Sequence, residues 1–242
     1  VILLFMLVPV AYVLSSSSAT SGSAPTEISF YYDIFDFFAN HLASLEPTIR
    51  SSGEDVLPNV YCGILTIILI PMYIFSDKIR STEKIASVFL LSFFYISFNV
   101  NYLNFIWHGF HWPNDLPYRQ SFIYSFVLLI MAYKVFLRLK EFNSRQIGIV
   151  GAALLAFVFL VEKLTSKNVG PGTVLLTLAL TVLYVVMLTV FMDKRYQSAS
   201  LALLMLVCIC SEVVMCDSGT VSITITKDSY ASDYDDFRAD LG

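Results

Sequence analysis

The densest cluster of polar and aromatic side chains in this 242-residue sequence runs from Asn99 to Arg119. Asparagine, histidine, aspartate and arginine residues stand there beside two Trp and two Tyr. The aromatic rings alone are typical of a membrane–water boundary, where they anchor a chain. Charged and amide groups at membrane depth are costly, and they tend to line a cavity or to bind a ligand. This segment is therefore the candidate site.

His108 and His111 are three residues apart, so a helix would place both imidazoles on one face. Together with Asp115 they could ligate a divalent metal ion. However, Gly109 and Pro113 interrupt a helix here, and a bare His-x-x-His is a weak metal signal. We therefore favour the interpretation in which both histidines form local hydrogen bonds that fix the loop, and we assign no metal ligand in this chain.

Arg119 stands where an apolar run begins, next to Tyr118. A guanidinium at this position is placed to hold a phosphate or pyrophosphate head group through two hydrogen bonds. Snorkelling of the side chain to the membrane interface explains the same position equally well.

The elements that must position these side chains are membrane helices. The chain is 57% hydrophobic and 14% charged, with a mean hydropathy of +0.70, whereas soluble domains carry about 25% charged residues. Apolar runs of about 20 residues cross the hydrocarbon core as helices. We expect an all-α polytopic protein with about seven spans, the first one truncated, near residues 1–14, 59–76, 85–105, 120–137, 147–165, 172–192 and 198–216.

The loops set the expected orientation. Nine of the 15 cationic residues lie in three short loops, 77–84, 134–146 and 193–197, which places these loops in the cytoplasm. Segments 15–58, 106–119 and 166–171 and the tail 217–242 are then extracytoplasmic. Because Val1 falls inside an apolar run, we also expect the chain to be an internal fragment of a longer protein.

Two outer segments carry structural patterns of their own. Residues 28–45 show apolar side chains at helical spacing, which suits either an amphipathic helix in the membrane interface or a helix packed on the spans. Thr220–Thr226 alternates Val and Ile with Thr and Ser, which predicts a β-strand that opens an extracytoplasmic domain over 217–242.

Three carboxylates outside the cluster have candidate roles of their own. Asp33 and Asp36 could act as a pair above the membrane, but their spacing favours the solvated face of an amphipathic helix. Glu212 lies in the last span, where a carboxylate can join a proton or ion path, although a local hydrogen bond is the simpler role.

Two runs carry a family resemblance. LPNVYCGIL over 57–65, followed by FIWHGFHWPNDLPYRQSF over 105–122, resembles the bacterial YfhO family of membrane proteins. The likeness runs through most of the chain. It implies a fold like that of the GT-C glycosyltransferases, and transfer of a sugar from a polyprenyl-phosphate carrier to a cell-envelope acceptor such as teichoic acid. It also implies a catalytic carboxylate, often linked to a divalent metal in the full-length protein, in a loop that precedes Val1.

Under this resemblance the segment forms the wall of a substrate site. Arg119 would contact the carrier phosphate, a Trp would stack on a sugar, and the asparagines would orient sugar hydroxyls. The candidate substrate-binding residues are Asn101, Asn104, Trp107, His108, His111, Trp112 and Arg119.

Two other functions stay open: a transporter or flippase of lipid-linked intermediates, and a non-catalytic membrane scaffold. The expected partners are the bilayer, the lipid-linked sugar and the polymer acceptor. Nucleic acid is not expected, because the net charge is −4 and no basic block is present. No cofactor is expected within this chain.

Overall fold

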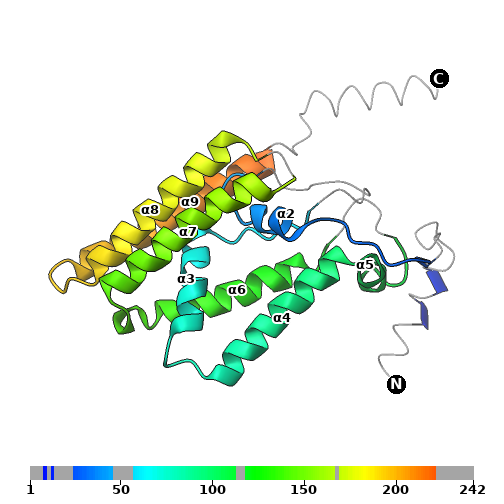
Figure 1. Ribbon diagram of the computed structural model, residues 1–242, viewed down its shortest axis with the longest axis horizontal. Coiled ribbons are helices and arrows are strands. Elements are labelled where there is room, and N and C mark those ends of the chain that lie inside the picture. Colours follow the sequence, from blue (N-terminus) through cyan, green and yellow to red (C-terminus); the bar gives the residue numbers. More distant parts are fainter. Residues whose placement is uncertain are drawn as a thin grey trace.

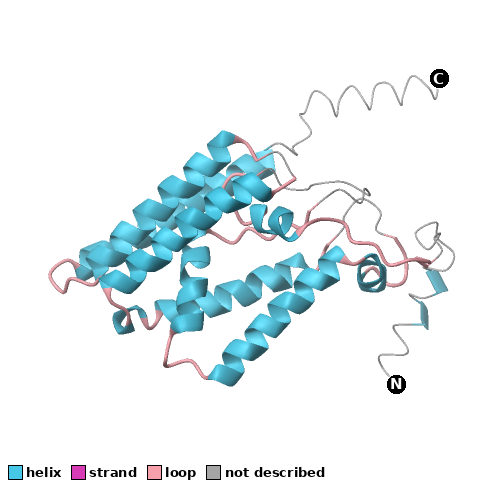
Figure 2. Cartoon of the chain, in the orientation of Figure 1, coloured by secondary structure: helices cyan, strands magenta, loops and turns pink. Residues whose placement is uncertain are grey.

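The computed structural model describes residues 8–9, 12–13, 24–45, 57–112, 118–166 and 169–221, with side chains described as far as residue 215. Within these ranges the protein consists of helices joined by loops (Figure 2). The helices are α2 Ile34–Ala39, α3 Ile64–Phe75, α4 Ser81–Asn99, α5 Asn101–Trp107, α6 Ser121–Phe136, the short 3₁₀ helix η2 Leu139–Glu141, α7 Ser144–Leu164, α8 Pro171–Phe191 and α9 Gln197–Val221. The prediction of an all-α membrane protein is confirmed.

Three of the helices are long and apolar enough to cross a membrane: α7, α8 and the Gln197–Met215 part of α9. Each coincides with one of the spans expected from the sequence. Helices α3 and α6 are also apolar but shorter, with 12 and 16 residues. At 1.5 Å per residue, α3 extends about 18 Å, which is less than the hydrocarbon core of about 30 Å.

Local sequence signals mark the starts of helices α7 and α8. Asn143 and Gln146 form a reciprocal cap at the beginning of α7, each side chain accepting from the other's backbone N–H at 2.9 Å. Pro171 occupies the first turn of α8, where its missing N–H costs nothing. Two strong start signals thus agree with the observed helix boundaries.

Successive long helices run in opposite directions, so the molecule has two ends (Figure 1). We call the end that carries α5 and residues 118–121 the aromatic end, and the end that carries residues 76–80, 137–143 and 193–196 the basic end. Helices α7, α8 and α9 lie side by side, while α6 packs on α3 and α4. The main core contains residues of α3, α6, α7, α8 and α9, including the fully buried Ile68, Tyr184 and Leu204.

The expected span 85–105 is interrupted. Helix α4 ends at Asn99, and Val100 is extended because its backbone forms an antiparallel bridge with Phe30. Helix α5 then begins at Asn101. A contact from far along the chain therefore overrides the continuous helix that the local pattern predicted.

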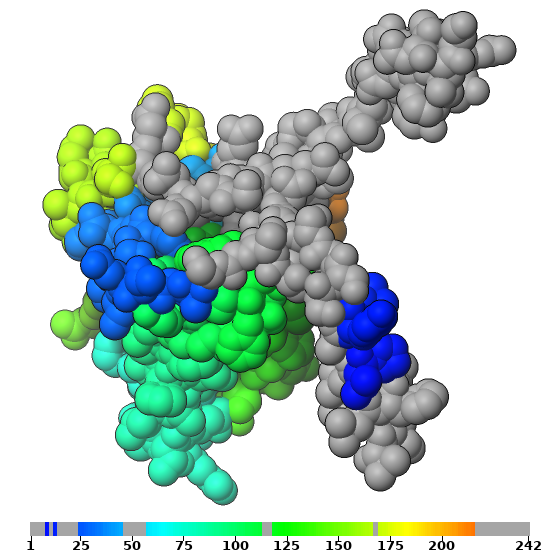
Figure 3. Space-filling model, turned by 90° about the vertical axis from the view of Figure 1, so that its right-hand side faces the viewer, coloured from blue at the N-terminus to red at the C-terminus, as the bar shows by residue number. Residues whose placement is uncertain are grey.

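Segment 28–45 does not form one long amphipathic helix. It contains the six-residue α2, which contacts α7 and buries Phe37 and Ala39 at 2% and 0% exposure. Of the two alternatives, packing on the bundle is the one observed. Figure 3 shows this blue segment lying against the green and teal surface of the chain. The predicted β-strand differs too: Thr220 and Val221 lie in α9, and the rest of the strand falls outside the described residues. Most of the expected first span, 1–14, also falls outside them.

Candidate functional site

At the aromatic end, residues 29–32 are hydrogen-bonded to the α4–α5 junction, and these hydrogen bonds hold the candidate site in place. The Asn99 side-chain oxygen accepts from the N–H groups of Tyr31 and Tyr32 at 2.9 and 3.0 Å. The Asn101 oxygen accepts from Ser29 at 3.2 Å, and its amide donates to the carbonyl of Glu27 at 2.8 Å. Asn101 is therefore a fastening residue in this structure, with both halves of its amide engaged by the chain.

Asn104 differs from Asn101. It is 3% exposed, and its amide nitrogen donates to the Tyr31 hydroxyl at 3.4 Å. Its side-chain oxygen is buried and has no hydrogen-bond partner among the described residues. A buried acceptor in this state is uncommon and points to a water or ligand.

Orphaned polar atoms gather at this end of the molecule. Six buried side-chain atoms lack a hydrogen-bond partner within the described part of the chain, and five belong to the aromatic end. These five are Tyr32 Oη, Ser97 Oγ, Asn104 Oδ1, His108 Nε2 and Gln120 Nε2. Because each buried unpaired group costs free energy, their concentration in one region distinguishes it from the rest of the fold.

The two histidines form local hydrogen bonds. His108 Nδ1 lies 2.7 Å from the carbonyl oxygen of Asn104, and His111 Nδ1 lies 2.8 Å from that of Trp112. Because a carbonyl only accepts, each Nδ1 carries a proton, and Nε2 of a neutral imidazole is then an acceptor. The rings are 6.4 Å apart between centroids in an edge-to-face arrangement. The described residues contain no group of three potential metal ligands, and Asp115 lies outside them.

The two tryptophans are placed differently. Trp107 is 41% exposed and stacks on Phe94, with ring centroids 6.4 Å apart. Trp112 packs edge-on against Phe105 at 5.6 Å. Trp107 is thus partly open to the surface.

Arg119 is exposed at the aromatic end and directly follows Tyr118. Tyr118 is 3% exposed and has a φ of 59°, a left-handed backbone that is uncommon for a bulky residue. Phe110, with a φ of 63°, is a second such residue in the same region. Backbone strain of this kind clusters at functional sites, and no local sequence signal indicated it.

The structure corrects the expectation for Asp36. Instead of lying on a solvated face it is 2% exposed. Its carboxylate accepts from the Thr165 hydroxyl at 2.7 Å and from the backbone N–H and hydroxyl of Ser166, both at 2.8 Å. Burial alone would raise the pKa of Asp36, but these hydrogen bonds outweigh it and hold the pKa below its ordinary value. Asp36 therefore ties α2 to the end of α7.

His41 is a second buried polar residue that the sequence did not single out. Its Nδ1 lies 3.1 Å from the Phe37 carbonyl, and its Nε2 lies 3.0 Å from the Tyr124 hydroxyl. Burial lowers the pKa of His41 to about 4, so the neutral imidazole bridges segment 34–45 to α6 at neutral pH. A single histidine in an apolar run gave no signal of this contact.

Glu212 forms a hydrogen bond, but its partner lies far away in the sequence rather than nearby. The Tyr61 hydroxyl donates to Glu212 Oε1 at 3.4 Å, joining α9 to the residues that precede α3. Gly63 lies against the Glu212 carboxylate with a φ of +92°, and a Cβ at that position would come within 2.8 Å of Glu212 Oε1. Only glycine fits this close approach.

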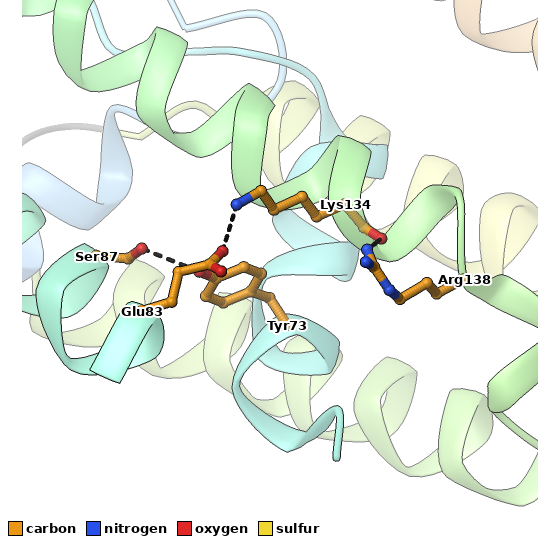
Figure 4. A network of polar contacts seen from close by, with 5 residues as sticks. All are labelled: Tyr73, Glu83, Ser87, Lys134 and Arg138. Carbon is orange, nitrogen blue, oxygen red and sulfur yellow. Dashed lines mark hydrogen bonds and ion pairs between the residues drawn. The ribbon is translucent and has the colours of Figure 1, made fainter. Parts of the chain in front are cut away.

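A polar network at the basic end joins Glu83 to Lys134, a cationic residue that the sequence indicated only as an orientation signal (Figure 4). Glu83 accepts from the Lys134 ammonium and from the Tyr73 hydroxyl, the latter at 3.0 Å. Tyr73 also lies 3.0 Å from the Ser87 hydroxyl, and Arg138 donates to the Lys134 carbonyl at 2.9 Å. The charged groups are 37% and 39% exposed, a level at which an ion pair adds little stability. The network links α3, α4 and α6 far from the candidate site.

Comparison with known protein families identifies the family of this chain. The family model described as "Bacterial membrane protein YfhO" matches residues 1–238. Comparison with curated proteins and with solved structures gives no match. The family match covers nearly the whole chain and agrees with the apolar helices seen in the fold. The chain therefore belongs to the YfhO family of bacterial membrane proteins.

Proposed function

We propose that this protein takes part in transferring a sugar from a polyprenyl-phosphate carrier to a cell-envelope acceptor such as teichoic acid. The observation that carries the proposal is the gathering of orphaned polar atoms at the aromatic end. A sugar presents hydroxyls that both donate and accept, so it can satisfy Asn104 Oδ1 and His108 Nε2 together. An apolar or purely anionic ligand cannot donate to these two acceptors.

The neighbouring side chains suit the other parts of such a donor. Trp107 offers a ring face on which a sugar can stack. Arg119 is exposed one residue after the strained Tyr118, and its guanidinium can hold the carrier phosphate while negative charge develops on it. In this proposal these residues bind the donor, and none of them serves as the base that activates the acceptor.

The proposed orientation places the aromatic end outside the cytoplasm. Its support is the cationic residues of segments 77–84, 134–146 and 193–197, which lie at the opposite end of the helices. A cysteine introduced at the exposed Phe110 should then react with a membrane-impermeant maleimide in intact cells, and one at Glu141 should not. The reverse labelling would refute the orientation.

Substitution of Arg119 tests the site. In the full-length protein in its host, Arg119→Ala should lower the sugar content of the envelope polymer by about 10- to 100-fold, the effect of losing a charge-assisted hydrogen-bond pair. Arg119→Lys should restore only part of it, because an ammonium does not present two parallel donors. Arg145→Ala, which removes an exposed arginine at the start of α7, is the matched control. Unchanged glycosylation with normal protein levels would remove Arg119 from the site.

A second candidate function, a flippase of lipid-linked intermediates, is favoured by Glu212, a carboxylate within a spanning helix. An assay in detergent micelles distinguishes the two functions. A transferase still moves labelled sugar to an acceptor in micelles, whereas a flippase has no membrane sides between which to act. Transfer in micelles that Glu212→Gln leaves unchanged would exclude the flippase.

A further inference from the structure

A cavity of about 690 Å³ lies between α3, α4, α6 and α7, with α2 over one end of it. Its volume is within the range of sites that hold small organic ligands, about 300–1,000 Å³. In Figure 1, α7 belongs to the three-helix layer with α8 and α9, and α4 and α6 diverge from that layer across α3. It is distinct from the orphaned polar atoms of the candidate site.

The residues that line the cavity are spread over several turns of two helices. On α7 its wall runs from Ile149 to Val158, and on α3 from Ile64 to Phe75. At 1.5 Å per residue these stretches extend about 14 and 16 Å, or about half the thickness of the hydrocarbon core. The cavity is therefore long enough to hold part of an extended hydrocarbon chain.

The wall offers no obvious anchor for a polar ligand. It is lined mainly by aliphatic and aromatic side chains, and its larger polar residues are engaged within the protein. His41 and Tyr124 bond each other, Thr177 donates to the Thr173 carbonyl at 2.7 Å, and Tyr95 accepts from Asn99 at 3.2 Å. Water finds too few polar partners in such a site. Lining residues such as Phe75 and Ile149 are exposed, so the cavity opens to the surroundings of the helices, and a hydrocarbon occupant suits its apolar wall.

The cavity and the candidate site are neighbours, separated by packed aromatic rings. Tyr124 in its wall packs against Phe94 with ring centroids 6.5 Å apart, and Phe94 stacks on Trp107 at 6.4 Å. We propose that the cavity holds the hydrocarbon chain of the polyprenyl-phosphate donor, whose phosphate and sugar then lie at the aromatic end. This assignment rests on the proposed function, and it adds the place where the carrier lipid is bound.

The test uses the full-length protein in lipid nanodiscs and a polyprenyl phosphate with a diazirine in the middle of its chain. Irradiation should label residues of the cavity wall on α3, α4 and α7, as mapped by mass spectrometry. Excess unlabelled polyprenyl phosphate should abolish this labelling, and excess phosphatidylglycerol should leave it. Equal competition by both lipids would overturn the assignment in favour of an ordinary phospholipid chain, and labelling confined to the outer faces of the bundle would overturn the cavity itself.

A variant and its matched control then test whether labelling of the wall requires an open cavity. Ala153 lines the cavity and is exposed, so Ala153→Trp can project into the space without displacing a buried core residue. We expect about a tenfold loss of wall labelling, as for a ligand that must compete with a bulky side chain. Ala152→Trp changes the neighbouring exposed alanine, which does not line the cavity, and should label like the unmodified protein.

The same variants separate this inference from the proposed function. If Ala153→Trp folds normally, as judged by gel filtration and thermal stability, but retains both labelling and sugar transfer, the cavity is not the chain site although transfer stands. If the wall is labelled selectively but no sugar transfer occurs with any donor, the lipid site stands and the transferase proposal fails. If the cavity wall is not labelled and another polypeptide segment of the protein fills the space between α3 and α7, the inference is overturned.

Discussion

Replacing Asp36 should loosen the attachment of α2 to α7. The carboxylate accepts three hydrogen bonds of 2.7–2.8 Å from Thr165 and Ser166, and a weaker one of 3.3 Å from the Asp33 N–H. Hydrogen bonds to an ionised group contribute about 1.5–3 kcal/mol each, and they are not additive when they share one acceptor. We therefore expect Asp36→Ala to lower the free energy of unfolding by about 4 kcal/mol, near the upper end for single substitutions.

Asp36→Asn should cause a smaller loss in the free energy of unfolding than Asp36→Ala. The amide keeps one oxygen as an acceptor but replaces the other, which accepts from the Ser166 hydroxyl, with a donor. The expected loss is about 2 kcal/mol. The matched control is Asp33→Asn, the same change at an exposed residue three positions earlier, where the free energy should stay within about 0.5 kcal/mol.

Unfolding titrations with SDS in mixed micelles, followed by the fluorescence of the two tryptophans, measure these differences. A double-mutant cycle of Asp36→Asn with Thr165→Val should give a coupling energy of about 1–2 kcal/mol. The effect should be the same at pH 7 and pH 5. Because the folded pKa of Asp36 is lowered, its contribution is present above the unfolded value of about 3.9 and is lost only as the pH falls through the folded pKa. Equal losses for the variants at Asp36 and Asp33, or no coupling to Thr165, would refute the clamp.

Two further predictions concern His41 and Gly63. Because burial lowers the folded pKa of His41 to about 4, the unfolded state binds its proton first, and stability is lost as the pH falls from about 6.5 towards 4. Between pH 7 and pH 5 this loss should be about 2 kcal/mol in the same titration, and it should vanish in His41→Gln; an unchanged pH slope in that variant would contradict it. Gly63→Ala should cost more than about 1 kcal/mol, because it combines a positive φ with a Cβ 2.8 Å from Glu212 Oε1. Gly148→Ala, at a helical position with no atom within 4 Å of the new Cβ, should be neutral or stabilising by thermal unfolding; equal effects of the two substitutions would show that Gly63 is not constrained.

The expected region of the candidate site can be read from sequence because its signal is local. Two Trp, two His and Arg119 within one short segment are improbable by composition, and they mark the segment before any fold is known. The pairing of Asn143 with Gln146 and the position of Pro171 likewise predict where helices begin.

The division of roles inside that segment required the fold. Asn101 and Asn104 are both asparagines near the end of an expected span, yet one amide is fully engaged and the other has an orphaned oxygen. This difference depends on residues 27–31, which lie more than 70 positions away in the sequence. Composition and spacing carry no information about such a partner.

The sequence by itself determined that the chain is an all-helical membrane protein, because the length of an apolar run and the solvation of its backbone are properties of each segment alone. Only the tertiary structure decided that a helix breaks at Val100 and that Asp36 is buried. Both outcomes depend on distant partners: Phe30 pairs with Val100, and Thr165 lies 129 residues beyond Asp36. A buried carboxylate is stable only when its hydrogen bonds are satisfied, and whether those donors arrive is settled by the packing of helices rather than by the residues next to it.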